Sequence, residues 1–240
     1  MLACDKDVCD GALDDMVSDC STYDAKIVDD LRSDCSSDHG DVNTLIIFDW
    51  DDTLFPTSWT FTKGLLDDSA MPSEKNSELF LKLAVTIERV LKSASQLGKV
   101  VIVTNAQQGW VEMCCSKLLP SLLSVLRSVD IVSARFCHEQ ESDDPTEWKR
   151  LEFLKQVELI HGSNNQHLNL ISVGDSSHER QALVSACASV QSSSGKSLKF
   201  AECPTIERLL DQLDLVNTSI VDVAEHNGHL DIEIGSDDSP

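Results

Sequence analysis

Two aspartates that directly follow a short apolar segment are the residues of this chain best suited to chemistry. The segment Leu45–Phe48 holds four apolar residues in succession, which predicts a strand buried on both faces, as in a parallel sheet. Asp49 and Asp51 come next, two positions apart, so an extended chain projects their carboxylates to the same side. Burying carboxylates at the end of a buried strand costs free energy, so they are expected there only where a cation compensates their charge or a reaction uses them. The pattern therefore predicts a metal-binding or catalytic pair, and a charged turn that only caps the strand is the alternative.

Two later segments repeat the arrangement of an apolar run followed by polar residues. One run ends in Thr104 and Asn105, and another leads through Gly174 into Asp175, with Glu179 four residues further on. Ligands of open α/β sheets bind beyond the carboxyl ends of the strands, where the chain direction reverses. We therefore expect these polar residues to lie near the two aspartates of the first segment.

A lysine follows the start of a predicted helix. Asp144 is suited to the N-cap position and Pro145 to the first helical position, which places Lys149 on the early turns of that helix. From there its ammonium group can point into a cleft at the end of the sheet. Arg150 and Lys155 lie close by in the sequence and are alternative cations for the same position.

The four segments, in this order, resemble the four motifs of the haloacid dehalogenase (HAD) superfamily of phosphotransferases with an aspartate nucleophile. The first motif, DxDxT, is matched by Asp49-Trp50-Asp51-Asp52-Thr53. The matches to the other three motifs are a hydroxyl residue at a strand end (Thr104), a lysine near a helix start (Lys149) and an acidic pair after a strand (Asp175 with Glu179). Family members more often carry Asp where this chain has Glu179. The resemblance covers roughly residues 44–215, and it identifies no particular subfamily.

The resemblance implies a phosphohydrolase that works through an aspartyl-phosphate intermediate. Asp49 would attack phosphorus as the nucleophile, and Asp51 would protonate the leaving oxygen and then deprotonate the hydrolytic water. Dehalogenases and P-type ATPases of the superfamily lack an Asp at the second place, so Asp51 points to phosphatase or phosphomutase chemistry. The implied substrate is a phosphate monoester, on either a small molecule or a protein.

The resemblance also implies a Mg²⁺ cofactor and a set of residues that hold the phosphoryl group. The metal would be bound by Asp49, the main-chain carbonyl of Asp51 and Asp175, with Glu179 as an outer partner. The phosphoryl oxygens would be held by three residues, Thr104, Asn105 and Lys149.

Alternating strand and helix signals predict an α/β fold with a doubly wound, Rossmann-like parallel sheet of about five strands and helices on both faces. We expect Trp110, at a helical position, to lie in the core. The stretches before residue 73 and before residue 144 are too short for a large cap domain, so we expect a small flap and an open cleft. The expected strands lie at 44–49, 100–104, 130–134, 168–173 and 198–201, and the expected helices at about 73–97, 107–117, 120–129, 146–160, 177–190 and 204–215.

Charge divides the chain into three parts. The net charge is −22 over 240 residues, but residues 1–43 carry 12 acidic and 3 basic residues, and residues 221–240 carry 6 acidic residues and no Lys or Arg. We therefore expect an acidic, Cys-, Ser- and Asp-rich disordered arm at 1–43, a catalytic domain at 44–220 and an acidic disordered tail at 221–240. Acidic tails repel nucleic acids and anionic membranes, so we expect neither as a partner.

The nine cysteines are expected to be reduced thiols. The start of the chain has no basic segment followed by an apolar core, and no run approaches the roughly 20 apolar residues of a membrane span. These features predict an intracellular, cytoplasmic protein.

Two other functions fit the same motifs. A non-catalytic module could bind Mg²⁺ or phosphate on the same fold, although such a module is expected to have lost Asp49 or Asp51, and both are present. A phosphotransferase could pass the phosphoryl group to an acceptor other than water. The oligomeric state and the physiological substrate stay open.

Overall fold

A single parallel sheet organises the protein. The computed structural model describes residues 44–67, 69–161 and 166–234. Within them, six strands pair in the order β3-β2-β1-β4-β5-β6, and every pairing is parallel. The predicted fold class is confirmed, with one strand more than the expected five. The strands are β1 (Thr44–Phe48), β2 (Lys99–Thr104), β3 (Asp130–Ser133), β4 (Leu168–Gly174), β5 (Ser193–Phe200) and β6 (Leu230–Ile234).

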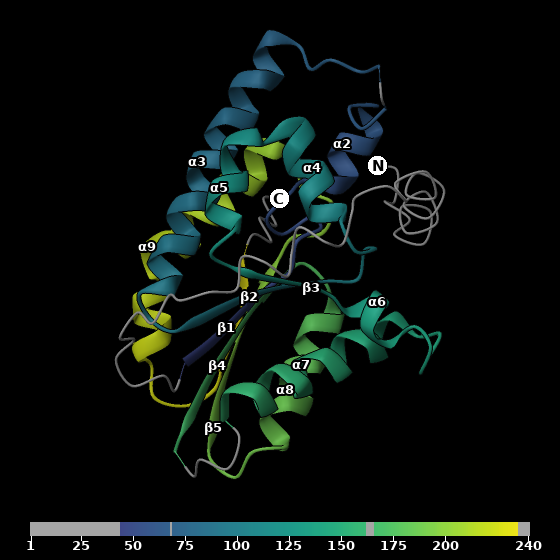
Figure 1. Ribbon diagram of the computed structural model, residues 1–240. Helices are drawn as coiled ribbons and strands as arrows, with labels where there is room; N and C mark the ends of the chain where they lie inside the picture. The colour runs from purple at the N-terminus through teal and green to yellow at the C-terminus, as the bar shows by residue number, and fades with distance from the viewer. Residues whose placement is uncertain (1–43, 68, 162–165, 235–240) are drawn as a thin grey trace, which may run out of the picture.

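Helices cover both faces of this sheet (Figure 1), with α3 and α9 packed together on one side and α7 and α8 on the other. The short helix α6 packs on α7. The helices are α2 (Thr57–Thr62), α3 (Glu74–Ser95), α4 (Trp110–Leu118), α5 (Leu123–Leu126), α6 (Ala134–His138), α7 (Pro145–His161), α8 (Ser177–Ala188) and α9 (Ile206–Glu225), with a 3₁₀ turn at Pro120–Leu122.

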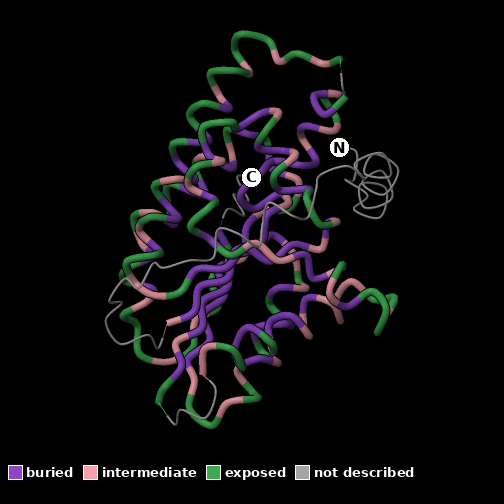
Figure 2. The backbone as a smooth tube through the Cα atoms, viewed as in Figure 1, coloured by how far each residue is buried: buried purple, intermediate pink, exposed green. Residues whose placement is uncertain are grey.

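The apolar run of β1 is explained by this layering. Ile46 and Phe48 belong to the core shared with α3 and α9, whereas Leu45 and Ile47 belong to the core shared with α7 and α8. Successive strand residues point to opposite faces, so a strand covered on both sides needs an apolar residue at every position. Figure 2 shows the result as buried central strands between the two helical layers.

The ordered fold continues past residue 220, the predicted end of the domain. Helix α9 runs to Glu225, and β6 adds to the edge of the sheet by pairing with β5. The buried side chain of Lys196 on β5 donates to the carbonyl of Ala224 at 2.9 Å, which ties the end of α9 to the sheet. The prediction of a disordered tail from residue 221 is therefore wrong for 221–234, while the arm at 1–43 and residues 235–240 lie outside the described residues.

The segment between β1 and α3 contains one small helix, α2, and is anchored to the core by Phe55, which precedes that helix. Phe55 stacks between Trp50 and Phe80, with ring centroids 5.8 and 6.5 Å away. This packing fixes the short segment directly beside the carboxyl end of β1.

The cysteines and the helices bear on two predictions from the sequence, reduced thiols and the lack of a membrane span. The thiols of Cys114, Cys115, Cys137 and Cys187 are free, but Cys203 is disulfide-bonded, so the expectation of reduced thiols throughout is wrong there. Among the described helices, none has both the length and the apolar character of a membrane span.

Candidate active site

The chain reverses its winding direction between β1 and β4, and two of the predicted acidic residues lie at that place. The chain runs outward from β1 through β2 to β3, then returns to β4 on the other side of β1. Asp49 follows β1 and Asp175 follows β4, and the main-chain N–H of Asp49 donates to the carbonyl of Val173 at 2.9 Å. Both side chains are buried. The fold therefore brings Asp49 and Asp175 to the switch point, where α/β proteins bind ligands.

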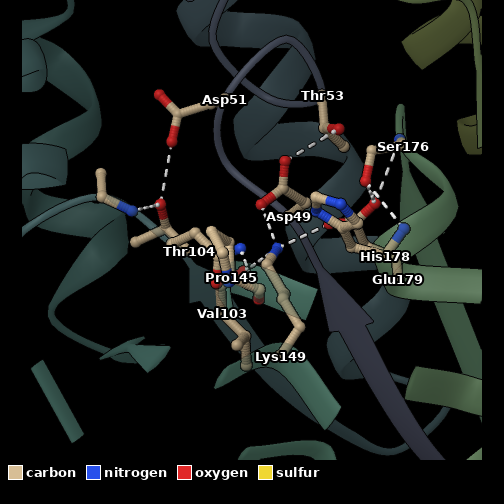
Figure 3. Close-up of polar contacts among 12 residues, drawn as sticks. Asp49, Asp51, Thr53, Val103, Thr104, Pro145, Lys149, Ser176, His178 and Glu179 are labelled. Carbon is tan, nitrogen blue, oxygen red and sulfur yellow. Dashed lines mark hydrogen bonds and ion pairs between the residues drawn. The ribbon is translucent and has the colours of Figure 1, made fainter. Parts of the chain in front are cut away.

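Lys149 reaches this place from the first turns of α7. The helix begins at Pro145, and the carboxylate of Asp144 accepts from the N–H of Thr146 at 2.9 Å, as the N-cap assignment predicted. The Lys149 ammonium contacts Asp49 Oδ1 and donates to the carbonyl of Val103 at 2.8 Å (Figure 3). Its side chain is only 1% exposed.

The alternative cations face elsewhere. Arg150 pairs with Glu147 at 2.5 Å on the outer side of α7, and Lys155 lies 3.4 Å from Glu152. Among the three candidates, Lys149 is the one in contact with Asp49.

Glu179 is the second carboxylate in contact with Lys149. Its Oε1 lies 2.9 Å from Lys149 Nζ, and its Oε2 accepts from Ser176 N at 3.1 Å and from Ser176 Oγ at 2.7 Å. The contact with Ser176 N is half of a capping box that starts α8. The backbone at Gly174 lies so close that a Cβ there would stand 2.5 Å from Glu179 Cγ. Glu179, predicted as an outer metal partner, thus uses both carboxylate oxygens on Lys149 and Ser176.

Acidic side chains surround the buried ammonium group of Lys149, and their burial and charges shift the pKa values of Asp49 and Lys149. Burial raises the pKa of Asp49 to about 7, with Glu179 and Asp51 adding to the rise and Lys149 opposing it. Burial lowers the pKa of Lys149, but the carboxylates of Asp49 and Glu179 outweigh burial and hold it above its ordinary value. Lys149 is therefore a permanent cation that partly offsets the negative charge of the site.

Asp51 points away from Lys149 and is held by hydroxyl and indole donors (Figure 3 shows the contact with Thr104). Its Oδ1 accepts from Thr57 Oγ1 at 2.6 Å and from Trp110 Nε1 at 2.8 Å. Its Oδ2 accepts from Thr104 Oγ1 at 2.8 Å. The carboxylate is therefore fixed by three elements of the fold, α2, α4 and the end of β2.

The two predicted phosphate ligands on β2 have protein partners in this structure. Thr104 Oγ1 donates to Asp51 and accepts from the N–H of Ala106 at 2.9 Å. The amide nitrogen of Asn105 donates to the carbonyl of Pro145 at 3.0 Å, which ties β2 to the start of α7. Thr104 lies beside Asp51 as expected, whereas the donor group of Asn105 positions the lysine helix.

Three further residues take part in the site, although the sequence analysis gave them no role there. Trp110 is buried, as predicted for a core residue, but it also donates to Asp51. Thr53 Oγ1 donates to Asp49 Oδ2 at 3.3 Å. Asp52, whose φ is +55°, binds the N–H of Ser58 at 2.9 Å and so fastens the start of α2. The threonine of the DxDxT pattern was a usable signal for Thr53, but Trp110 has only helical spacing.

The oxygen donors at the switch point fit a hard divalent cation. Among the described residues, no three His, Cys, Asp or Glu side chains form a metal-binding group. Mg²⁺ is usually held by one or two carboxylates together with waters. Asp49 and Asp175, buried at the ends of adjacent strands, supply two carboxylates of the required chemistry. Glu179 contacts Lys149 and Ser176, and so it belongs to the surroundings of these two carboxylates.

The protein is thus an α/β protein with a buried acid–lysine site at the switch point of a parallel sheet. Comparisons with protein-family models, curated proteins and solved structures gave no match to the chain. The likeness to the HAD superfamily therefore rests on the motifs.

Proposed function

We propose that this protein is a Mg²⁺-dependent phosphohydrolase of the HAD type that cleaves a phosphate monoester through an aspartyl-phosphate on Asp49. The observation that carries the proposal is the buried contact between Asp49 and Lys149 at the sheet switch point. A buried carboxylate next to a buried ammonium group is costly to assemble unless the pair has a task. Binding an anionic substrate group beside the nucleophile is such a task, because the ammonium group of Lys149 can offset the negative charge of that group.

The first half of the reaction uses Asp49 and Asp51. A carboxylate oxygen of Asp49 attacks phosphorus, a new P–O bond forms, and the P–O bond to the leaving group breaks. The leaving oxygen takes its proton from Asp51. Lys149, whose ammonium group lies against Asp49, stabilises the negative charge on the phosphoryl oxygens.

The second half returns the enzyme to its starting state. Asp51 takes a proton from water, the water oxygen bonds to phosphorus, and the P–O bond to Asp49 breaks to release inorganic phosphate. Asp49 and Asp175, with the main-chain carbonyl of Asp51, would hold Mg²⁺, which supplies charge neutralisation for the phosphoryl oxygens when it is bound. The substrate is a phosphorylated small molecule or protein.

The test is release of p-nitrophenol from p-nitrophenyl phosphate by the purified full chain, with Mg²⁺ or with EDTA, beside Asp49→Asn. We expect Mg²⁺-dependent turnover that the variant loses while its unfolding curve shows an intact fold. Full activity in Asp49→Asn would refute the assignment. If Mg²⁺ binds, but neither p-nitrophenyl phosphate nor a panel of phosphorylated peptides and sugars is cleaved, the non-catalytic module is the better account. Phosphorylated alcohol among the products, formed when an alcohol is added, would indicate transfer to an acceptor other than water.

A further inference from the structure

The carboxylate of Asp51 is held unequally on its two oxygens. Within the described residues, Oδ1 has two donors, Thr57 Oγ1 at 2.6 Å and Trp110 Nε1 at 2.8 Å, whereas Oδ2 has one, Thr104 Oγ1 at 2.8 Å. An indole N–H is a donor only and cannot exchange roles with its acceptor. The asymmetry therefore marks Oδ1 as the anchored oxygen.

The anchor on Oδ1 is itself rigid. Trp110 is 1% exposed, and its ring stacks on Phe61 of α2 with centroids 6.1 Å apart and an interplanar angle of 8°. Thr57 is buried at the first position of α2. The two donors come from α4 and α2, which the stacked rings hold against each other. The orientation of Oδ1 is therefore set by helices that lie outside the segment 49–56 that carries Asp51.

The single donor on Oδ2 is the one that a phosphoryl group would compete for. Thr104 has one hydroxyl proton, and its oxygen already accepts from the N–H of Ala106 at 2.9 Å. A Thr104 hydroxyl that turns to a phosphoryl oxygen can no longer donate to Asp51. Substrate binding would then release Oδ2 while Oδ1 kept both of its donors.

We propose that Trp110 and Thr57 are positioning residues for Asp51, which fix Oδ1 so that Oδ2 is the oxygen that exchanges protons with the substrate. The inference rests on the proposed hydrolase function. In the first step the proton moves from Oδ2 to the leaving oxygen as its bond to phosphorus breaks. In the second step Oδ2 receives a proton from the attacking water. Neither positioning residue touches the substrate.

The experiment compares two substrates whose leaving groups differ in their need for a proton. Phenoxide is a poorer leaving group than p-nitrophenoxide, so phenyl phosphate depends more on general acid catalysis, which contributes roughly 10²–10⁴-fold in enzymes. The readout is the ratio of kcat/KM for p-nitrophenyl phosphate to kcat/KM for phenyl phosphate, measured with Mg²⁺. This constant covers only the steps up to departure of the leaving group and excludes the hydrolysis step that both substrates share. The variants are Trp110→Phe, which keeps the aromatic stack, and Thr57→Val, with Thr57→Ser as the variant that restores the hydroxyl.

Trp148→Phe is the matched control, because its indole N–H donates to the carbonyl of Ser142 at 2.6 Å and not to the site. We expect the ratio to rise about tenfold or more in Trp110→Phe and Thr57→Val, which is part of the full contribution of a general acid, and to stay at the wild-type value in Trp148→Phe and Thr57→Ser. Equal losses on both substrates, or no loss, would overturn the positioning role and leave the hydrolase proposal standing. A wild-type protein that cleaves neither substrate, while it also fails to form a phosphoenzyme, would overturn both.

Discussion

Replacing Lys149 by methionine tests whether the ammonium group between two buried carboxylates holds the site together. Lys149, Asp49 and Glu179 have side chains 1%, 7% and 6% exposed. Removing the cation from such a buried group leaves uncompensated carboxylates, which costs about 3–5 kcal/mol of stability. The neighbouring Arg150 provides the matched control, because it also forms a close ion pair, with Glu147 at 2.5 Å, but the two side chains are 36% and 35% exposed. Arg150→Met is therefore expected to cost less than about 1 kcal/mol.

The assay is urea unfolding of Lys149→Met, Arg150→Met and wild type in EDTA, with the free energy of unfolding taken from the midpoint and slope. The deficit of Lys149→Met also depends on pH. Burial already raises the pKa of Asp49 to about 7, and Lys149 opposes that rise, so its removal lifts the pKa further. When the pKa of a carboxyl group is higher in the folded than in the unfolded state, the protein loses stability as pH rises from the unfolded to the folded pKa. In Lys149→Met this loss extends to higher pH than in wild type, so the difference in free energy of unfolding grows from pH 6 to pH 8. Equal losses in the two variants, or a deficit that shrinks toward pH 8, would refute this reasoning.

Three further perturbations test other parts of the structure. In Gly174→Ala, the new Cβ would stand 2.5 Å from Glu179 Cγ, so we expect a loss of about 1–3 kcal/mol in urea unfolding and a lower kcat, whereas an unchanged protein would contradict the close packing. Deletion of residues 221–240 removes β6 and the end of α9 with their buried apolar side chains, so we expect Tm to fall by at least about 4 °C in calorimetry; a disordered tail predicts no change. Burial raises the pKa of Cys115 to about 12, so mass spectrometry after alkylation at pH 8 is expected to find the half-buried Cys137 labelled well before Cys115 in the native protein, and both labelled equally in urea.

Much of the fold and part of the site could be predicted because local signals and tertiary packing agree there. The apolar run of β1 identifies a strand covered on both faces, and the capped start of α7 places Lys149 one turn into the helix. Parallel strands share one carboxyl edge, so Asp49 and Asp175 had to lie at the same end of the sheet. These predictions need only the period of each element and the order of the chain.

The remainder depends on contacts between elements that no local pattern encodes. The helical spacing of Trp110 predicts a core residue, and only the tertiary packing of α4, with Trp110 stacked on Phe61 of α2, brings its N–H to Asp51. The strand at Leu230–Ile234 does alternate apolar and acidic residues, a usable signal that the overall acidity of the last twenty residues obscured. β5 begins with serine and glycine, which are weak strand formers, so its first half was missed.

The most direct test of the account is mass spectrometry of the chain quenched in acid during turnover of p-nitrophenyl phosphate with Mg²⁺. The account predicts a phosphoryl group on the peptide that contains Asp49, removed by hydroxylamine and missing in Asp49→Asn. Rapid turnover with no phosphoryl group on the protein, or with the group on a residue other than Asp49, would contradict it.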